Sequence, residues 1–166
     1  MMSHRSGNYQ PEQIRLADTE AIRSLVYRYA HYFDAGDIER WLTLFTDDAQ
    51  ILTDTVGSPK GIEAIRDWAQ QRQQYNRDVQ IHHHMSNVVV SFQGEAIASV
   101  RSYLILTRQA SMGDGVTESE TISTDQPMTN VVVLASGVYQ DIVVQTSHGW
   151  KFRRREVAAS LPVSDI

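Results

Sequence analysis

The sequence predicts one α+β domain, and three observations support this. Helical periodicity is confined to the first part of the chain, from about Asp18 to Arg72. Long segments with the composition of strands follow, from His82 to Val157. The chain has 166 residues, which is the length of one domain, and 42% of them are hydrophobic, which is enough to build a core. Helices followed by antiparallel strands are the arrangement of an α+β fold.

The helices are expected in three places. Asp18 or Thr19 can cap the first helix, which Gly36 can end in a left-handed conformation. Asp37 can cap a short second helix, and a third is expected from about Gly61 to Arg72, with Ile62, Ile65 and Trp68 on its apolar face. The first helix carries an apolar stripe at helical spacing, made of Ile22, Leu25, Val26, Tyr29 and Phe33.

The strands are expected in five places, with breaks at glycine-containing turns. A brief strand covers about Ala49–Thr53. A hairpin joins His82–Phe92 to Glu95–Thr107 across Gln93-Gly94. Residues 109–127 are polar and are interpreted as a long loop. Two further strands run from Asn130 to Gln145 and from Trp150 to Val157, and Gly137 inside the first of them predicts a bulge or a bend.

Domain limits and composition narrow the possible functions. We expect a flexible segment over residues 1–15, one domain over 16–160 and a tail over 161–166. The formal net charge of −5 argues against binding nucleic acid, and the basic cluster Lys151–Arg155 is interpreted as a solvated strand face. The absence of cysteine excludes disulfides and thiolate metal sites. No targeting or membrane-spanning segment is recognisable, so a cytoplasmic location is expected.

Tyr29, Asp34 and the run His82-His83-His84 are the residues that could carry chemistry. Asp34 follows the buried stripe at the end of the first helix, where an exposed turn aspartate is the alternative. Tyr29 lies on the stripe itself and could serve only in packing. Strand alternation places His82 and His84 on one face with Val88 and Val90, and His83 on the other. No carboxylate follows the histidines at the spacing of a metal site, so no metal is predicted.

The order of several motifs resembles the nuclear transport factor 2-like superfamily, and in particular its SnoaL-like branch, which includes scytalone dehydratase and the bile-acid 7α-dehydratases. The resemblance spans roughly residues 16–160. The motifs that carry it are Tyr29-x-x-x-x-Asp34-x-x-Asp37, Leu44-Phe45-Thr46-Asp47-Asp48-Ala49, Gly61-Ile62-Glu63-Ala64-Ile65, His84-Met85-Ser86-Asn87, Gly137-Val138-Tyr139-Gln140-Asp141 and Gly149-Trp150-Lys151-Phe152 with Arg155.

The resemblance implies a cone-shaped α+β barrel, in which a strongly curved mixed or antiparallel sheet wraps around the N-terminal helices and encloses a pocket. It also implies a catalytic dyad of Asp34 and His84, with Tyr29 facing the same cavity. His84 would abstract a proton next to a carbonyl, Asp34 would orient its imidazole, and Tyr29 would stabilise the developing oxyanion. The residues expected to bind the substrate are Phe33, Trp41, Phe45, Trp68, His82 and Tyr103.

The function that follows is a cofactor-free lyase or isomerase, dehydratase-like, acting on a small apolar cyclic substrate such as a steroid, a polyketide or an aromatic-pathway intermediate. The alternative is a non-catalytic scaffold or binding protein resembling the β subunit of ring-hydroxylating dioxygenases. The second catalytic histidine of scytalone dehydratase is missing, since Arg101, Ser102 and Tyr103 stand in that region. Scytalone is therefore not expected as the substrate.

Two further expectations concern Arg155 and the outer face of the sheet. Alternation puts Arg155 opposite Trp150 and Phe152, so both a structural ion pair and a substrate contact remain open. Strand His82–Phe92 carries apolar residues in both alternating sets. One set must fill the cone and the other needs a cover, which predicts a homodimer or homotrimer.

Overall fold

The computed structural model describes residues 10–53, 57–76, 80–109 and 131–159. It contains helices α1 (Gln10–Asp34), α2 (Ile38–Leu42) and α3 (Ile62–Tyr75). The strands are β1 (Phe45–Thr53), β2 (Ile81–Phe92), β3 (Ile97–Gln109), β4 (Val131–Thr146) and β5 (Gly149–Ala159). These are the predicted elements in the predicted order. The expected loop over residues 109–127 lies, apart from Gln109, outside the described residues.

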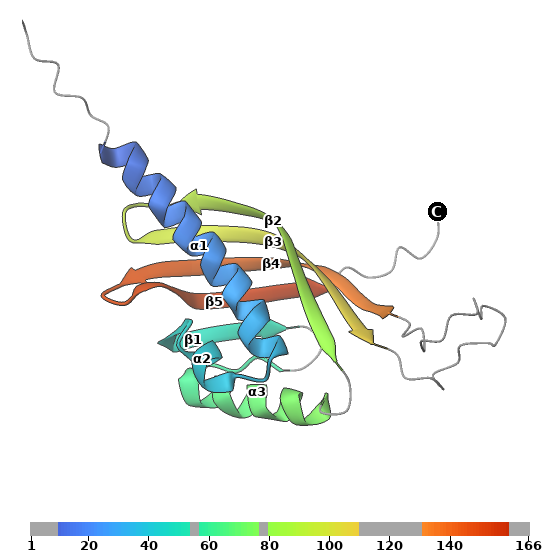
Figure 1. The fold of residues 1–166 in the computed structure, drawn as a ribbon. Coiled ribbons are helices and arrows are strands. Elements are labelled where there is room, and N and C mark those ends of the chain that lie inside the picture. The colour runs from blue at the N-terminus through green and yellow to red at the C-terminus, as the bar shows by residue number, and fades with distance from the viewer. Residues whose placement is uncertain (1–9, 54–56, 77–79, 110–130, 160–166) are drawn as a thin grey trace, which may run out of the picture.

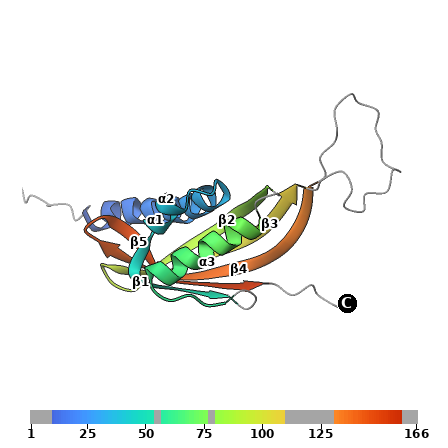
Figure 2. The same ribbon diagram turned by 90° about the horizontal axis from the view of Figure 1, so that it is seen from below.

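The five strands form one open sheet in the order β1-β5-β4-β3-β2 (Figure 1). The pairing of β1 with β5 is parallel and the other three are antiparallel, so the sheet is mixed. The three helices lie on one side of the sheet, and β4 curves strongly toward them (Figure 2). This arrangement confirms the prediction of a curved, cone-like sheet around helices.

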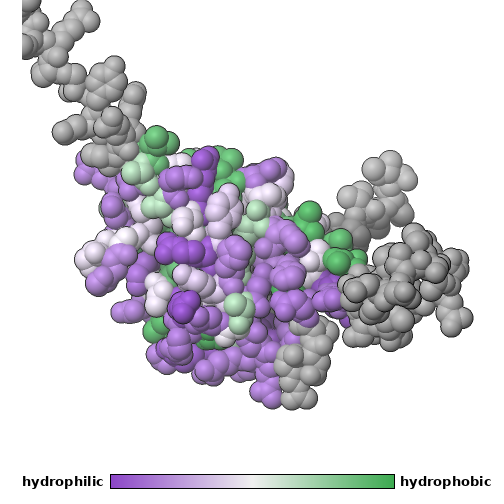
Figure 3. All heavy atoms as spheres, viewed as in Figure 1, coloured by the Kyte–Doolittle hydropathy of each residue, from purple (hydrophilic) through white to green (hydrophobic). Residues whose placement is uncertain are grey.

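The hydrophobic core lies between the helices and the concave face of the sheet. Side chains from α1, including Ile22, Leu25 and Val26, meet residues of the strands there. In Figure 3, which views the side that carries α1, hydrophilic residues predominate, and hydrophobic ones gather near the start of α1 and at the edge where β3 ends and β4 begins. None of the helices in the described part of the chain is long and apolar enough to cross a membrane.

The end of α1 is built as the sequence predicts, although the helix begins earlier, at Gln10, inside the segment 1–15 that we expected to be flexible. Gly36 has φ +71°. Its N–H bonds to the Phe33 carbonyl at 3.0 Å, and that of Asp37 to the Tyr32 carbonyl at 2.9 Å. This is a Schellman motif, which needs a residue that tolerates positive φ. Asp37 also caps α2 by accepting from the Arg40 N–H at 3.2 Å.

A β-bulge in β2 reverses the side-chain alternation of that strand. Ser86 pairs with Tyr103 and Val89 with Arg101, so Asn87 and Val88 together oppose Ser102. Asn87 has φ +51°, the left-handed conformation that asparagine adopts more readily than most residues. As a result, Met85 before the bulge and Val88 after it both pack against the core.

A second bulge changes the phase of β5. Ile142 pairs with Arg154 and Val143 with Phe152, which leaves Arg153 without a partner in the ladder. Phe152 and Arg155 are therefore both buried. The expectation that Arg155 faces away from Phe152 is wrong for this reason. In β4, Gly137 pairs regularly with Leu104. The irregularity there falls between the partners of Leu106 and Thr107, so of the bulge or bend predicted at Gly137, the bulge lies at Leu134 instead.

Candidate functional site

The carboxylate of Asp34 and the imidazole of His83 form a close pair. Asp34 Oδ1 lies 2.5 Å from His83 Nδ1, and Asp34 Oδ2 accepts the backbone N–H of His83 at 2.8 Å. One carboxylate at the C-terminus of α1 thus fixes both the main chain and the ring of a residue near the start of β2. Both side chains are largely shielded from solvent, with 12% of His83 and 13% of Asp34 exposed.

The hydrogen bond between the two side chains has a defined direction. A carboxylate only accepts hydrogen bonds, so the Nδ1 atom of His83 must carry the proton that the two residues share. The Nε2 atom of the neutral ring is then left with a free lone pair. A histidine oriented in this way by a second group is the usual arrangement of a general base.

His84 occupies the opposite face of β2, and the predicted Asp34–His84 dyad is therefore corrected to Asp34–His83. The His84 side chain is exposed, and its Nε2 lies 2.9 Å from Thr107 Oγ1. The prediction extended the alternation of Val88 and Val90 backward along the strand. The bulge at Asn87 shifts that alternation by one residue, which turns His83 inward and His84 outward.

A cavity of about 320 Å³ lies between α1, α3 and the sheet, and His83 and Tyr29 both line it. Most of its wall is apolar or aromatic. Its other described lining residues are Phe33, Ile51, Thr53, Trp68, Arg72, Tyr75, Asn76, Ile81, Leu104, Leu106, Leu134, Ala135, Ser136, Gly137, Tyr139 and Val157. An apolar chamber with a few convergent polar groups is the usual form of a small-molecule site.

The residues predicted to bind a substrate divide into three groups. Phe33 and Trp68 line the cavity. Trp41 and Phe45 belong to the buried core and do not line it. His82 and Tyr103 are exposed, and the cavity does not include them. The last two have no place in the cavity, since the shifted alternation of β2 and the phase of β3 turn them outward.

Tyr29 lies at the centre of a group of aromatic rings. Its ring stacks on that of Phe33 at 6.2 Å and meets that of Tyr139 at 5.9 Å, while the His83 ring stands edge-on to it at 6.2 Å. The hydroxyls of the two tyrosines interact and shift each other's pKa. Burial raises the pKa of both hydroxyls, that of Tyr139 strongly. Both therefore stay protonated at neutral pH and keep a proton to donate.

A buried ion pair packs against the rings of these two tyrosines. Arg155 donates from Nε and Nη2 to the two carboxylate oxygens of Asp141, each at 3.0 Å, and neither side chain is exposed. Burial raises the pKa of Asp141 to about 6, although Arg155 favours its charged form, so the carboxylate is ionised at neutral pH. The Arg155 guanidinium lies 3.8 Å from the ring centre of Tyr29 and 4.0 Å from that of Tyr139. Arg155 does not line the cavity, so of its two predicted roles the structure shows the ion pair.

Tyr139 and Asp141 were missed as site residues in the sequence analysis. Both stand in the motif Gly137–Asp141, and both share a strand face with Gly137, which lines the cavity. The alternation of β4 was therefore the available indication. Among the residues that the structure describes, no group of three or more His, Asp or Glu side chains could hold a metal ion.

Comparison with known proteins agrees with this architecture. An NTF2-like protein with a cystatin-like fold from Novosphingobium aromaticivorans superposes with a TM-score of 0.77 at 22% identity, over 99% of this chain and 94% of that one. A candidate scytalone dehydratase from the same organism gives 0.70 at 23% identity, over 90% and 89%. LinA gives 0.71 at 19% identity, over 93% and 95%. At these identities the likeness shows the fold, and no curated protein matches the sequence.

The sequence itself identifies the family. The family model described as "SnoaL-like domain" matches residues 14–156, which include all or most of every element from α1 to β5 and all of the described cavity wall except Val157. The motifs from Tyr29 to Arg155 that carry the resemblance lie inside this match. The chain therefore belongs to the SnoaL-like domain family, with the NTF2-like fold.

Proposed function

We propose that the protein is a cofactor-free lyase or isomerase of the dehydratase type, acting on a small, largely apolar cyclic compound. The observation that carries the proposal is the Asp34–His83 pair at the wall of an apolar cavity that Tyr29 also lines. Two of the solved structures with a similar fold are named as a candidate scytalone dehydratase and as LinA. The family match supports a small-molecule role of this general kind.

In the proposed reaction, Nε2 of His83 removes a proton from the carbon next to a substrate carbonyl. The C–H electron pair moves toward the carbonyl, and Tyr29 donates a hydrogen bond to the oxygen on which negative charge develops. Asp34 stabilises the imidazolium that forms, because its Oδ1 already accepts the Nδ1 proton. In an elimination, a hydroxyl on the neighbouring carbon then leaves as water with the proton from His83. In an isomerisation, His83 returns the proton to a different carbon.

Tyr29, rather than Tyr139, is assigned the donor role because it lies closer to the base. Its ring contacts those of His83 and Phe33. The interaction with the Tyr139 side chain favours the charged form of Tyr29 and so acts to lower the pKa of Tyr29, against the larger effect of burial. Tyr139 thus supports Tyr29 when the latter shares its proton with a substrate. Phe33 and Trp68 would hold the apolar ring of the substrate.

The test compares His83→Ala with His84→Ala on a panel of cyclic β-hydroxy ketones and unconjugated enones, with loss of water or double-bond migration followed by mass spectrometry and absorbance. Loss of a general base should lower turnover roughly 10²- to 10⁴-fold in His83→Ala, while His84→Ala should remain near wild type. Each assay is repeated with a chelator, which should have no effect. The mechanism would be wrong if His83→Ala turned over a substrate at the rate of the wild-type protein. It would also be wrong if the chelator alone abolished activity.

The scaffold alternative has a different outcome. If no compound of the panel is turned over, and the protein forms a stable complex with a catalytic subunit, as the β subunit of a ring-hydroxylating dioxygenase does, that function replaces the proposed one. We also infer self-association as a homodimer or homotrimer through the outer face of the sheet, where Val89, Tyr103 and Ile105 are exposed.

A further inference from the structure

A few polar side chains line the cavity besides those of the reactive site, and two of them come from the end of α3. Arg72 and Asn76, from the last turn and the C-cap of α3, line the cavity together with Thr53 and Ser136. Apolar and aromatic residues line the rest, apart from the polar groups of His83 and of the three lining tyrosines, Tyr29, Tyr75 and Tyr139. We propose that the natural ligand is an apolar ring that carries an anionic group, a carboxylate or a similar oxyanion, and that Arg72 binds this group.

The charge of the wall favours an anion over a neutral or cationic ligand. The protein as a whole has a formal net charge of −5. The described lining residues nevertheless include no Asp or Glu, and Arg72 is the single Lys or Arg among them. Arginine remains charged throughout the physiological pH range. An acidic protein that lines its cavity with one fixed positive charge creates a local preference for negatively charged ligands.

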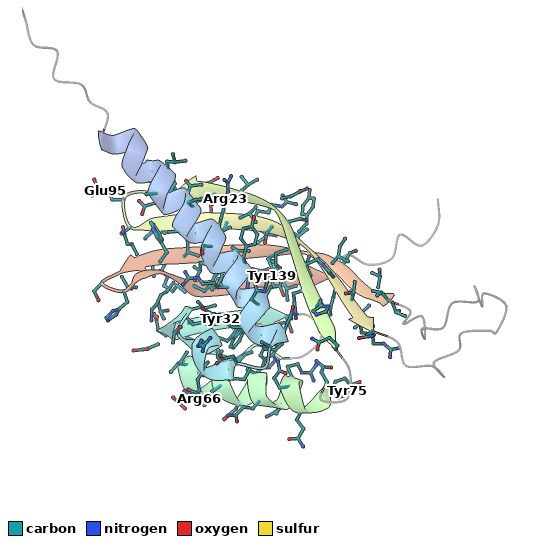
Figure 4. The ribbon with its side chains drawn as sticks, in the orientation of Figure 1. Arg23, Tyr32, Arg66, Tyr75, Glu95 and Tyr139 are labelled. Carbon is teal, nitrogen blue, oxygen red and sulfur yellow. The ribbon has the colours of Figure 1, made fainter. Side chains whose placement is uncertain are left out.

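The surroundings of Arg72 suit the binding of an anion by its guanidinium. Its side chain is half-buried, and the guanidinium carbon lies 5.4 Å from the centre of the Tyr75 ring, within the range of a cation–π contact. Tyr75, which also lines the cavity, is 79% exposed and lies at the end of α3 (Figure 4). A guanidinium near an aromatic ring can still offer N–H groups at its edge, which match the two oxygens of a carboxylate.

The position of Arg72 relative to the reactive pair is fixed by its neighbour. Gln73 donates from Nε2 to the Phe33 carbonyl at 2.5 Å, which ties the end of α3 to the residue before Asp34. A ligand anchored on Arg72 would therefore extend its ring along Trp68 and Phe33 toward His83. This deepens the proposed function and rests on it, because it assigns the anionic group to the substrate of the same site. A role for Arg72 only in complementing the helix dipole would need no ligand.

The experiment measures the binding of two probes of nearly equal shape, 2-naphthoate and 2-naphthamide, by isothermal titration calorimetry. The wild-type protein should bind the carboxylate at least about tenfold more tightly than the amide, the scale of one charge-assisted hydrogen bond. In Arg72→Gln that preference should disappear, with the affinity for the amide nearly unchanged. The preference should also weaken at high ionic strength, because exposed charge pairs are screened by salt.

Arg66→Gln is the matched control. Arg66 lies on the same helix outside the cavity, where it pairs with Glu39 and Glu63 (Figure 4). It should keep the preference for naphthoate, which separates a direct contact from a change in net charge. The inference is overturned if the wild type binds the amide as well as the carboxylate, if it binds no carboxylate at millimolar concentration, or if Arg72→Gln retains the preference.

Binding and turnover measured on the wild-type protein separate this inference from the proposed function. A preference for naphthoate without measurable elimination or isomerisation of any compound would leave the anionic ligand standing and remove the proposed chemistry. Turnover of neutral cyclic ketones, with no preference for naphthoate, would do the reverse.

Discussion

Asp34 and His83 are 49 residues apart in the sequence and are joined twice, through the ring and through the main chain. The double attachment means that Asp34 sets both the tautomer of His83 and the position of the strand that carries it. A substitution that keeps the main-chain bond while reversing the ring bond can separate these two effects.

Asp34→Asn is expected to do this. The amide oxygen can still accept the backbone N–H of His83, while the amide nitrogen faces Nδ1 as a donor. The ring should then adopt the tautomer with the proton on Nε2, and turnover should fall roughly 10²- to 10⁴-fold with little loss of stability. Steady-state kinetics and ¹⁵N chemical shifts of the imidazole would measure this. Asp48→Asn, at an exposed position, is the control, and near-normal turnover by Asp34→Asn would contradict the tautomer argument.

The left-handed backbone of Asn87 supports a prediction about stability. Asn87→Gly should be close to neutral, because glycine adopts positive φ without steric cost. Asn87→Val should destabilise the protein by roughly 1–2 kcal/mol, since a β-branched side chain is strained at φ +51°. Urea unfolding would measure the difference. Ser91→Val, on the same strand without positive φ, is the control. A stable Asn87→Val protein would mean that the bulge can relax at little cost.

The same bulge explains why the sequence identified the site but selected the wrong histidine. The C-terminal end of α1, the order of the elements along the chain and the positions of Tyr29 and Asp34 follow from periodicity and capping, which are local properties. The start of α1 does not, because the helix begins at Gln10, before the predicted cap at Asp18 or Thr19. The direction of His83 depends on an irregularity four residues away, and His82-His83-His84 offers a histidine to either face. Asn87 was visible in the sequence, but an asparagine within a strand does not by itself locate a bulge.

Arg155 shows the same limit at the other side of the cavity. Its position was recognised, but the extra residue Arg153 in β5 reversed the face on which it was expected. Its partner Asp141 lies on the neighbouring strand, and no sequence pattern pairs the two. Both errors come from register, which is set by tertiary packing rather than by the local sequence.

Tyr29 and Tyr139 should ionise only at a pH above the ordinary pKa of a tyrosine hydroxyl. Their folded-state pKa values are raised by burial. The unfolded-state value is about 10. A raised folded-state pKa contributes stability that is present below pH 10 and lost as the pH rises through the folded-state pKa. Alkaline titration of the tyrosinate absorbance should therefore show a late component that coincides with unfolding.

The variants assign this late component. Tyr29→Phe and Tyr139→Phe should each reduce its amplitude, because each removes one of the seven tyrosines of the chain. Tyr75→Phe, at an exposed position, should leave it intact. Complete titration of the absorbance in a protein that circular dichroism shows to be folded would contradict the burial argument.

The outer face of the sheet predicts self-association. Tyr103 is 47% exposed, Ile105 46% and Val89 59% on adjacent strands β2 and β3. Apolar side chains on neighbouring strands favour a cover, and a second copy of the chain is the simplest one. Light scattering at micromolar concentration should give the mass of a dimer or a trimer. Ile105→Lys should shift this mass toward that of a monomer, because a lysine would bury a charge in the contact.

Thr43→Lys is the control for this last prediction. Thr43 is exposed at the end of α2, on the helical side of the molecule, and the same added charge there should leave the mass unchanged. The circular dichroism of both variants should match that of the wild type, since neither position belongs to the core. A monomeric wild-type protein would show that these apolar side chains remain in contact with water. An equal decrease in mass in both variants would mean that the added charge, and not its place on the outer face, causes the dissociation.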